Sequence, residues 1–269
     1  MGKGAYRIMA VIIGAGNVAS ALAPALETAG LEISQIWSRN PDNAARLAST
    51  LKIPAQPIAD LSQIRQGEDL YLVSVTDDAI RPIAQRMKGF GGLWAHTSGS
   101  VDADVLSDIT DTYGVFYPLQ TFTRGITVEM SEVPLYIEGS DAASRQSLLE
   151  IAGRISRRVS LADSSRRRRL HAAAVFACNF VNYMWSVADD ILREEGDDIS
   201  VLFPLIEETM RKMEATGDPA AVQTGPARRN DKGVMDGHAR LLSPEHSELY
   251  RTVSEKIINR YHPNERDQL

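Results

Sequence analysis

The stretch VIIGAGNVAS, residues 11–20, decides how the first half of this sequence folds. An apolar run ends there in Gly-Ala-Gly, and each small residue has a task in a dinucleotide-binding turn. Gly14 permits the tight bend, Gly16 lets the backbone approach a pyrophosphate, and Ala19 lets the following helix pack closely on the strand. The stretch therefore predicts a dinucleotide-binding turn, with a purely structural turn of another α/β fold as the alternative.

The context of this turn supports the nucleotide interpretation. Residues 7–13 have the apolar pattern of a buried strand, and residues 17–29 that of a helix that ends at Gly30. The start of the helix at Asn17 and Val18 is expected to present unpaired N–H groups and the positive end of the helix dipole to a phosphate. A signal peptide is the competing interpretation of this region, but it explains neither glycine, so we expect none.

Strand-like and helix-like segments alternate over the first part of the chain. Further strands are expected at residues 31–37, 69–75, 92–98, 114–119, 134–139 and 157–163, and helices at 41–51, about 77–87 and about 142–156. Such alternation is typical of β-α-β units and a parallel sheet. The strands are apolar with little alternation, which suits a sheet that is covered on both faces. The sequence thus predicts an α/β domain of the Rossmann type.

The pattern changes after about residue 163. Residues 166–195 form one long helical segment that is apolar around most of its circumference, as expected of a helix buried in a helical domain or in a subunit interface. Further helices are expected near 199–215, 232–242 and 244–260, and the tail 262–269 is expected to fray. We therefore predict a Rossmann domain over residues 1–162, followed by an all-α domain over 163–269.

The end of the second predicted strand indicates which dinucleotide would bind. A protein that binds NAD usually carries Asp or Glu there, for the ribose hydroxyls. This chain has Ser38, Arg39 and Asn40 instead. A carboxylate would repel a 2′-phosphate, whereas a hydroxyl and a guanidinium would bind it. The sequence therefore predicts NADP(H), with a solvated loop arginine as the alternative role of Arg39.

Two more strand ends carry polar residues. Thr76 follows the strand 69–75, and Thr97 and Ser98 end the strand 92–98. In open α/β folds, ligands bind at the carboxyl edge of the sheet. We expect these side chains to line the nicotinamide side of the cofactor site, whereas the neighbouring Asp77 and Ser100 could cap the helices that follow.

Composition narrows the classes of protein further. The formal net charge of −6 and the pI near 5.5 argue against binding to nucleic acid. The one cysteine, Cys178, excludes an internal disulfide and fits a cytoplasmic protein. No apolar run has the length of a membrane span. The five histidines show no metal-ligand spacing, so no metal site is expected.

Several phrases of the sequence together are specific. They are GAGNVA at 14–19, HTSGS at 96–100, FYPLQTF at 116–122, LHAAAVFACNF at 170–180, QTGPARRND at 223–231, and His238. In this combination the chain resembles Rossmann-like proteins with the C-terminal domain of unknown function DUF2520, over nearly its whole length. Such proteins are often described as NADP-dependent oxidoreductases or as similar to deazaflavin-dependent reductases.

The resemblance implies an NADP-binding domain, an all-helical domain and a homodimer through the helical domain. This arrangement is similar to pyrroline-5-carboxylate reductase and 6-phosphogluconate-dehydrogenase-like enzymes. Related hydroxyacid dehydrogenases carry a Lys and an Asn four residues apart on the first long helix of the second domain. Here His171 takes the lysine-like position, and Val175 is its i+4 neighbour. The lysine acid of those enzymes is therefore absent.

His171 is nevertheless a candidate acid, because an imidazole titrates near neutral pH and can protonate a carbonyl oxygen. The alternative is a buried structural histidine. Asn179 and Asn182 are candidates to orient a substrate. With about 100° per residue, α-helical spacing returns Asn182 to the face of His171 and turns Asn179 aside by roughly 80°. Ser98 completes the predicted catalytic residues.

The loop QTGPARRND supplies the remaining candidates. In the family pattern Thr224 belongs to the turn, and Arg229 and Asp231 are the matching charged pair. Arg229 has the geometry to hold a carboxylate with two hydrogen bonds. A structural Arg–Asp pair that fixes the loop is the alternative. The basic run Arg166–Arg169 is either a solvated face or a site for an anion or an acidic partner.

Together these features predict an NADP(H)-dependent oxidoreductase. It would transfer hydride to or from a small carbonyl or imine substrate where the two domains meet. Two alternatives remain. One is a dimeric NADP-binding sensor or scaffold without turnover, which the missing lysine favours, and the other is an imine reductase of the pyrroline-5-carboxylate type.

Overall fold

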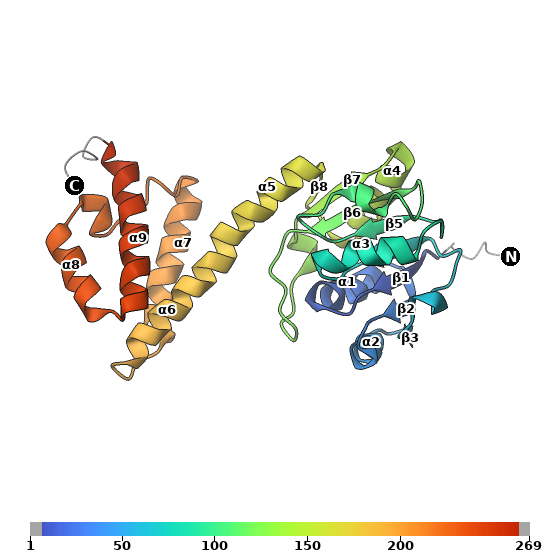
Figure 1. The fold of residues 1–269 in the computed structure, drawn as a ribbon, viewed down its shortest axis with the longest axis horizontal. Helices are drawn as coiled ribbons and strands as arrows, with labels where there is room; N and C mark the ends of the chain where they lie inside the picture. The colour runs from blue at the N-terminus through green and yellow to red at the C-terminus, as the bar shows by residue number, and fades with distance from the viewer. Residues whose placement is uncertain (1–6, 264–269) are drawn as a thin grey trace. The chain divides into compact units, whose positions relative to one another are not determined.

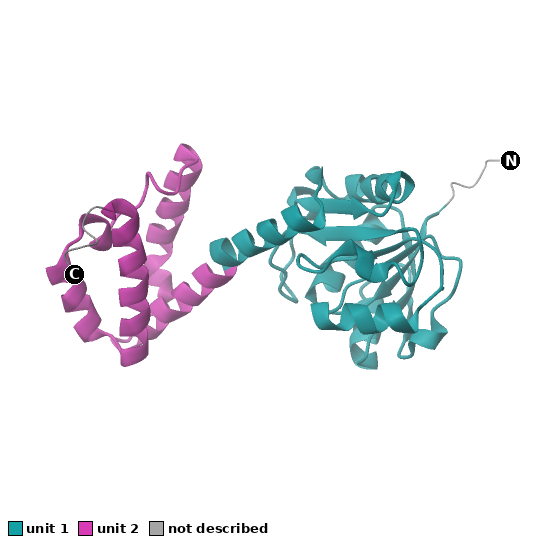
Figure 2. Cartoon of the chain, turned by 45° about the horizontal axis from the view of Figure 1, so that its top comes forward, with its two compact units in different colours: residues 1–178 teal, residues 179–269 magenta. Residues whose placement is uncertain are grey.

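The computed structural model describes residues 7–263, and the chain divides into two compact units, residues 1–178 and 179–269 (Figures 1 and 2). The expected fraying of the tail concerns residues that lie mainly outside the described range. The first unit is built on one sheet. Its strands are β1 (Met9–Ile13), β2 (Glu32–Trp37), β3 (Gln56–Ile58), β4 (Leu70–Val73), β5 (Trp94–His96), β6 (Tyr113–Pro118), β7 (Leu135–Gly139) and β8 (Val159–Leu161).

The order of the strands is β3-β2-β1-β4-β5-β6-β7-β8, and every pair except β6 and β7 is parallel. The first six strands follow the order of the dinucleotide-binding fold, in which successive strands are added on one side of β1 up to β3 and then, from β4, on its other side. The predicted Rossmann-type α/β fold is confirmed. The fully parallel sheet is not, because residues 119–134 connect β6 to β7 without a crossover helix and β7 returns antiparallel.

Helices cover both faces of this sheet (Figure 1). They are α1 (Asn17–Thr28), α2 (Pro41–Ala48), α3 (Asp77–Arg86) and α4 (Ala142–Ile155), and α5 (Ser164–Ala174) leads away from the sheet after β8. One core layer joins α1, α2 and α4 to strand residues such as Ile12, and the other joins α3 to residues such as Val11. Successive strand residues point to opposite faces, so an unbroken apolar run such as β1 serves both layers.

The second unit is helical. After α5 the helix continues through a π-helical turn, Val175–Phe180, into α6 (Val181–Arg193). It is followed by α7 (Phe203–Thr216), α8 (Lys232–Leu241) and α9 (Pro244–Tyr261). All the predicted helices are present. Within residues 7–263, none of the helices combines the length and the hydropathy needed to cross a bilayer.

The expectation of a buried long helix needs correction. No residue of α6 is buried, and Tyr183, Met184 and Trp185 are between 38% and 49% exposed. Within residues 179–263, the buried residues are Ala227, Ala239 and Ser254. The packing of the helical unit itself therefore does not bury the apolar side chains of this helix. Of the two predicted environments, burial in a subunit interface remains a prediction.

Candidate functional site

The glycine turn has the geometry that its sequence predicts. Gly14 has a φ of +122°, and its N–H donates to the carbonyl of Trp37 at 2.8 Å. A Cβ on Gly14 would lie 2.0 Å from the carbonyl oxygen of Ser74, which follows β4, so only glycine fits. A Cβ on Gly16 would meet no atom within 4 Å and would project into open space. The turn therefore offers an open cradle where a pyrophosphate is expected.

The first turn of α1 faces this cradle. Gly16 is the N-cap and provides no side-chain cap, and the first turn contains no acidic residue. The first N–H groups of a helix have no partner within the helix, and here no side chain replaces one. Ala19 is fully buried, as close packing of helix on strand requires. The start of α1 is thus suited to an anion.

A cavity of about 400 Å³ opens over the glycine turn and collects every residue predicted to bind the cofactor. It lies at the carboxyl ends of β1, β2, β4 and β5, at the switch point of the sheet. Of its lining residues, those predicted from sequence are Gly14, Gly16, Asn17, Val18, Ser38, Arg39, Asn40, Thr76 and Thr97. The cavity and the open space beside Gly16 fit a dinucleotide.

Of the three residues after β2, two have side chains that hydrogen-bond the local backbone, and the third is exposed. Ser38 is buried, and its Oγ accepts a hydrogen bond from the N–H of Asn40 at 3.3 Å. The Asn40 Oδ1 accepts from the N–H of Asp42 at 3.0 Å and caps α2. Arg39 is exposed. The pKa of Asp78 is lowered mainly by a hydrogen bond from the Thr76 side chain, and the charge of Arg39 lowers it further. The Arg39 guanidinium therefore lies near the start of α3, beside the cavity.

Sequence reasoning missed one cation at this cavity. Arg124 lies in the irregular segment between β6 and β7, and one of its terminal nitrogens donates to the carbonyl of Ala15 at 3.2 Å. Arg124 lines the nucleotide cavity. No local sequence signal points to it, because an arginine in a loop is usually solvated and its partner is 109 residues away.

The turn after β5 is held by His96, whose ring is fully buried. Its Nδ1 accepts from the N–H of Ser98 at 3.1 Å, so Nε2 carries the proton and faces the carbonyl of Asp102 at 3.3 Å. Burial, with the nearby charge of Arg167, lowers the pKa of His96 to about 4. His96 is therefore a neutral structural imidazole.

Ser98 also has structural work at this turn. Its Oγ accepts hydrogen bonds from the N–H groups of Ser100 and Val101, both at 3.0 Å. Its side chain is buried. These bonds give Ser98 a structural role in the turn, and its catalytic role stays a prediction.

His171, on α5, has a partner on the sheet that sequence reasoning did not name. Its Nδ1 lies 3.0 Å from the hydroxyl of Tyr117, near the end of β6, and the two rings meet edge to face. Burial raises the pKa of Tyr117 to about 12, so the hydroxyl keeps its proton and can either donate to Nδ1 or accept a proton from it. A Cβ on Gly99 would lie 2.7 Å from the His171 ring, so the glycine of HTSGS makes room for the imidazole.

The basic run at the start of α5 is largely explained. Arg167 is fully buried and pairs with Glu138, and its guanidinium also donates to the carbonyl of Val101 and to Ser164. Arg168 pairs with Asp102. These contacts attach α5 to the sheet, so the run is not simply a solvated face. Arg169 is exposed, and nothing in the structure explains it.

The predicted substrate residues of the helical unit are not brought together. Asn182 lines a cavity with Trp185 and Phe203, and Thr224 lines a different one. The Asp231 carboxylate accepts from the N–H of Val234 at 3.2 Å and caps α8. Among residues 7–263 no ion pair joins Arg229 to Asp231.

The asparagine positions depend on the π-helical turn Val175–Phe180. Asn179 lies within it and Asn182 comes after it. A π turn takes in about one extra residue and so rotates the residues beyond it by roughly 100° relative to α-helical spacing. The α-helical spacing that placed Asn182 on the face of His171 therefore does not hold, and the roles of both asparagines stay predictions. Over the described part of the chain, no group of three or more metal-ligating side chains comes together.

The strand order, the glycine turn and the cavity define a Rossmann-type nucleotide-binding protein. Two family models match: a Rossmann-like domain over residues 3–120, and the domain of unknown function DUF2520 over residues 133–257. A protein from Bacteroides fragilis described as a "putative NADP oxidoreductase" is 38% identical, with 94% of this chain and 98% of that chain covered and a TM-score of 0.87. The chain therefore belongs to the family of Rossmann-like proteins with a C-terminal DUF2520 domain, which confirms the resemblance seen in its sequence.

More distant structures share the fold. A Thermotoga maritima protein is 21% identical, with 96% of this chain and all of that one covered and a TM-score of 0.66. A Myxococcus stipitatus imine reductase, solved in complex with NADP⁺, is 17% identical, with 93% of this chain and 92% of that one covered and a TM-score of 0.63. No curated protein sequence matches the chain.

Proposed function

We propose that the protein is an NADP(H)-dependent oxidoreductase that transfers hydride to or from a small carbonyl or imine substrate. The observation that carries this proposal is the single cavity at the sheet's switch point, which gathers all nine residues predicted to bind the cofactor. The Bacteroides fragilis relative, described as a "putative NADP oxidoreductase", supports it. When bound, NADPH supplies the hydride, and the residues of this chain bind it and manage the proton.

The two ends of the cavity have different binding tasks. The open cradle at Gly16 and the N–H groups at the start of α1 would hold the pyrophosphate. Arg39 would bind the 2′-phosphate, because it is the exposed cation after β2 and Ser38 and Asn40 are engaged with the backbone. This assignment explains why a chain that lacks an acidic residue at this position would prefer NADPH over NADH.

His171 is the proposed proton donor. Tyr117 is almost entirely buried, whereas His171 is only half-buried and can reach a substrate. In its protonated form the His171 imidazolium would donate from Nδ1 to the Tyr117 hydroxyl oxygen and carry its second proton on Nε2. From Nε2 this proton would pass to the oxygen or nitrogen of the substrate as hydride arrives at carbon, which leaves His171 as a neutral imidazole. Tyr117 and Gly99 act through His171 and are positioning residues.

The test monitors NADPH oxidation with a panel of keto acids, cyclic imines and deazaflavins. His171→Ala should lower kcat by about 10²–10⁴-fold while NADPH binds with unchanged affinity. Tyr117→Phe should lower kcat less and shift the pH profile of kcat. Tight NADPH binding without consumption across the panel would instead support the sensor or scaffold. Turnover of cyclic imines alone would support the imine reductase alternative.

Cofactor choice has its own test. Arg39→Ala should weaken NADPH binding by about 10-fold or more and leave NADH binding unchanged. Arg46→Ala is the matched control, because Arg46 is an exposed arginine on α2 that does not line the cavity. An unchanged NADPH affinity in Arg39→Ala would remove the 2′-phosphate assignment.

We further propose that the protein is a cytoplasmic homodimer that pairs through its helical unit. Apolar side chains of this unit are exposed by 37% at Ile191 and up to 79% at Leu241. A monomer rarely exposes so many, and a second copy is the partner that the family resemblance implies. Light scattering at micromolar concentration should give twice the mass of the 29.5 kDa chain. The substrate roles of Asn179, Asn182, Thr224, Arg229 and Asp231, and the domain boundary at residue 162, remain proposals.

A further inference from the structure

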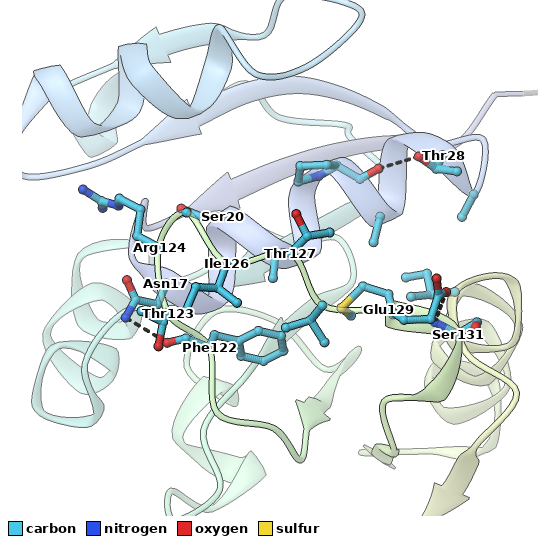
Figure 3. Close-up of a pocket in the computed structure, with 18 of the residues that line it drawn as sticks. Asn17, Ser20, Thr28, Phe122, Thr123, Arg124, Ile126, Thr127, Glu129 and Ser131 are labelled. Atoms are coloured by element: carbon cyan, nitrogen blue, oxygen red, sulfur yellow. Dashed lines mark hydrogen bonds between the residues drawn. The ribbon is translucent and has the colours of Figure 1, made fainter. Parts of the chain in front are cut away.

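The irregular segment 121–131, here called the strap, runs from β6 toward β7 past the start of α1. Figure 3 shows it beside α1, where the two enclose a second cavity of about 600 Å³. Phe122, Val128 and Met130 pack on the core. Between residues 122 and 129, two side-chain hydrogen bonds fasten the strap to the rest of the described chain.

Both of these bonds end on the glycine turn. The Asn17 side-chain amide donates to the carbonyl of Phe122 at 3.0 Å, drawn as a dashed line in Figure 3. The Arg124 guanidinium donates to the carbonyl of Ala15 at 3.2 Å. In Figure 3 the Arg124 side chain extends away from the second cavity, and it also lines the nucleotide cavity. The strap is thus attached to the residues that would surround a pyrophosphate.

We propose that Arg124 is a pyrophosphate-binding residue and that the bound dinucleotide fastens the strap to the glycine turn. This inference rests on the proposed function. A guanidinium has five N–H donors, and within the described chain the Ala15 carbonyl is the one acceptor that Arg124 contacts. The first turn of α1 contributes no carboxylate to compete for this cation. The remaining donors therefore suit an anion at the cavity.

The strength of the contact supports the assignment. A hydrogen bond from guanidinium to a neutral carbonyl is weaker than one to a phosphate, because charge on both partners shortens and strengthens the bond. The start of α1 and Arg124 approach the same space, so a phosphate there would receive backbone N–H groups and a side-chain cation together. Arg39 and Arg124 would then hold different phosphates of one cofactor.

The experiment measures dissociation constants for NADPH and NADH by calorimetry. Both cofactors carry the pyrophosphate, and only NADPH carries the 2′-phosphate. Arg124→Ala should raise both dissociation constants by a similar factor, about 10–100-fold. Arg39→Ala should raise only that of NADPH. Arg154→Ala is the matched control, because Arg154 lines the second cavity but not the nucleotide cavity, and it should change neither.

A second readout monitors the strap directly. In the wild type, NADPH should slow amide hydrogen exchange in residues 121–129, and Arg124→Ala should lose this protection at saturating NADPH. Arg124→Lys should retain part of the affinity, because lysine keeps the positive charge but lacks the planar guanidinium that can donate two parallel hydrogen bonds to one phosphate. Equal affinities of Arg124→Ala and wild type would overturn the assignment, as would a loss confined to NADPH. A wild type that binds neither cofactor would overturn the proposed function as well, which keeps the two failures distinct.

Discussion

The two units of this chain differ in how far their large apolar side chains are exposed. In the sheet unit Trp94, Tyr71 and Phe116 are fully buried between helices and strands. In the helical unit Trp185, Phe203 and Leu205 are 40–63% exposed. A parallel sheet with helices on both faces encloses its own core, whereas a few helices with wide apolar faces need another surface to cover them. The difference indicates that the sheet unit encloses a core of its own, whereas the helical unit leaves most of its large apolar side chains for another surface to cover.

A matched pair of leucines tests this difference with the largest expected effect. Leu22→Ala, at a fully buried position on α1, should lower the free energy of unfolding by about 3–5 kcal/mol. Leu205→Ala, at a position on α7 that is 63% exposed, should change it by less than about 0.5 kcal/mol in dilute protein. Denaturant unfolding, recorded at several protein concentrations, measures both.

The same pair addresses the proposed dimer. Where a second copy covers α7, Leu205→Ala should weaken association, so its effect on unfolding should appear only at concentrations at which the wild type is dimeric. A loss of several kcal/mol at every concentration would contradict the difference between the units, because Leu205 would then be packed within a single chain.

The stability of the two units should also respond differently to acid. The folded-state pKa of His96 is about 4, below the ordinary value of 6.5, so the unfolded chain binds the proton more tightly. The stabilisation is fully present above pH 6.5 and is lost as the pH falls from 6.5 toward 4, by about 3 kcal/mol in all. Among the described residues the helical unit has no fully buried histidine. Acid sensitivity in this range should therefore be concentrated in the sheet unit.

Hydrogen exchange between pH 4 and 7 measures this unit by unit. Protection in β4, β5 and β6 should fall with acid, while that in α9 should change little. His96→Gln should be less stable than wild type at pH 7 and should lose most of the pH dependence between 6.5 and 4. Equal slopes in the variant and the wild type would show that other groups carry the acid sensitivity.

The sequence predicted the parts of the molecule that depend on neighbours along the chain. The glycine turn, α1 and the residues after β2 lie within about 30 residues of each other, and their spacing identifies the cofactor cavity. Side-chain partners far apart in sequence were not predictable. Tyr117 and His171 are 54 residues apart, and Arg124 and Ala15 are 109 apart.

Two backbone features could not be predicted from the periodicity of apolar residues in the sequence. The connection from β6 to β7 has no helical pattern, but its length alone does not tell a crossover from an antiparallel return. The π-helical turn Val175–Phe180 keeps an apolar, helix-forming sequence and differs only in its hydrogen bonds. Both features depend on which backbone N–H and C=O groups form hydrogen bonds with each other, and the pattern of a single sequence does not determine this.

The smallest expected effect concerns Asp231, which was predicted to contact substrate and is found as the N-cap of α8. Asp231→Ala removes the side-chain acceptor and should destabilise the helical unit by about 1 kcal/mol. Asp231→Asn keeps an acceptor and should be nearly as stable as wild type, since Asn and Asp are comparable caps. Asp141, which caps α4 in the sheet unit, provides the matched pair of substitutions, and Asp141→Ala should cost a similar amount. With stability matched in this way, activity of Asp231→Asn becomes informative. An unchanged kcat/KM means that Asp231 only caps its helix, whereas a loss of 10-fold or more without loss of stability means that its charge also acts on substrate.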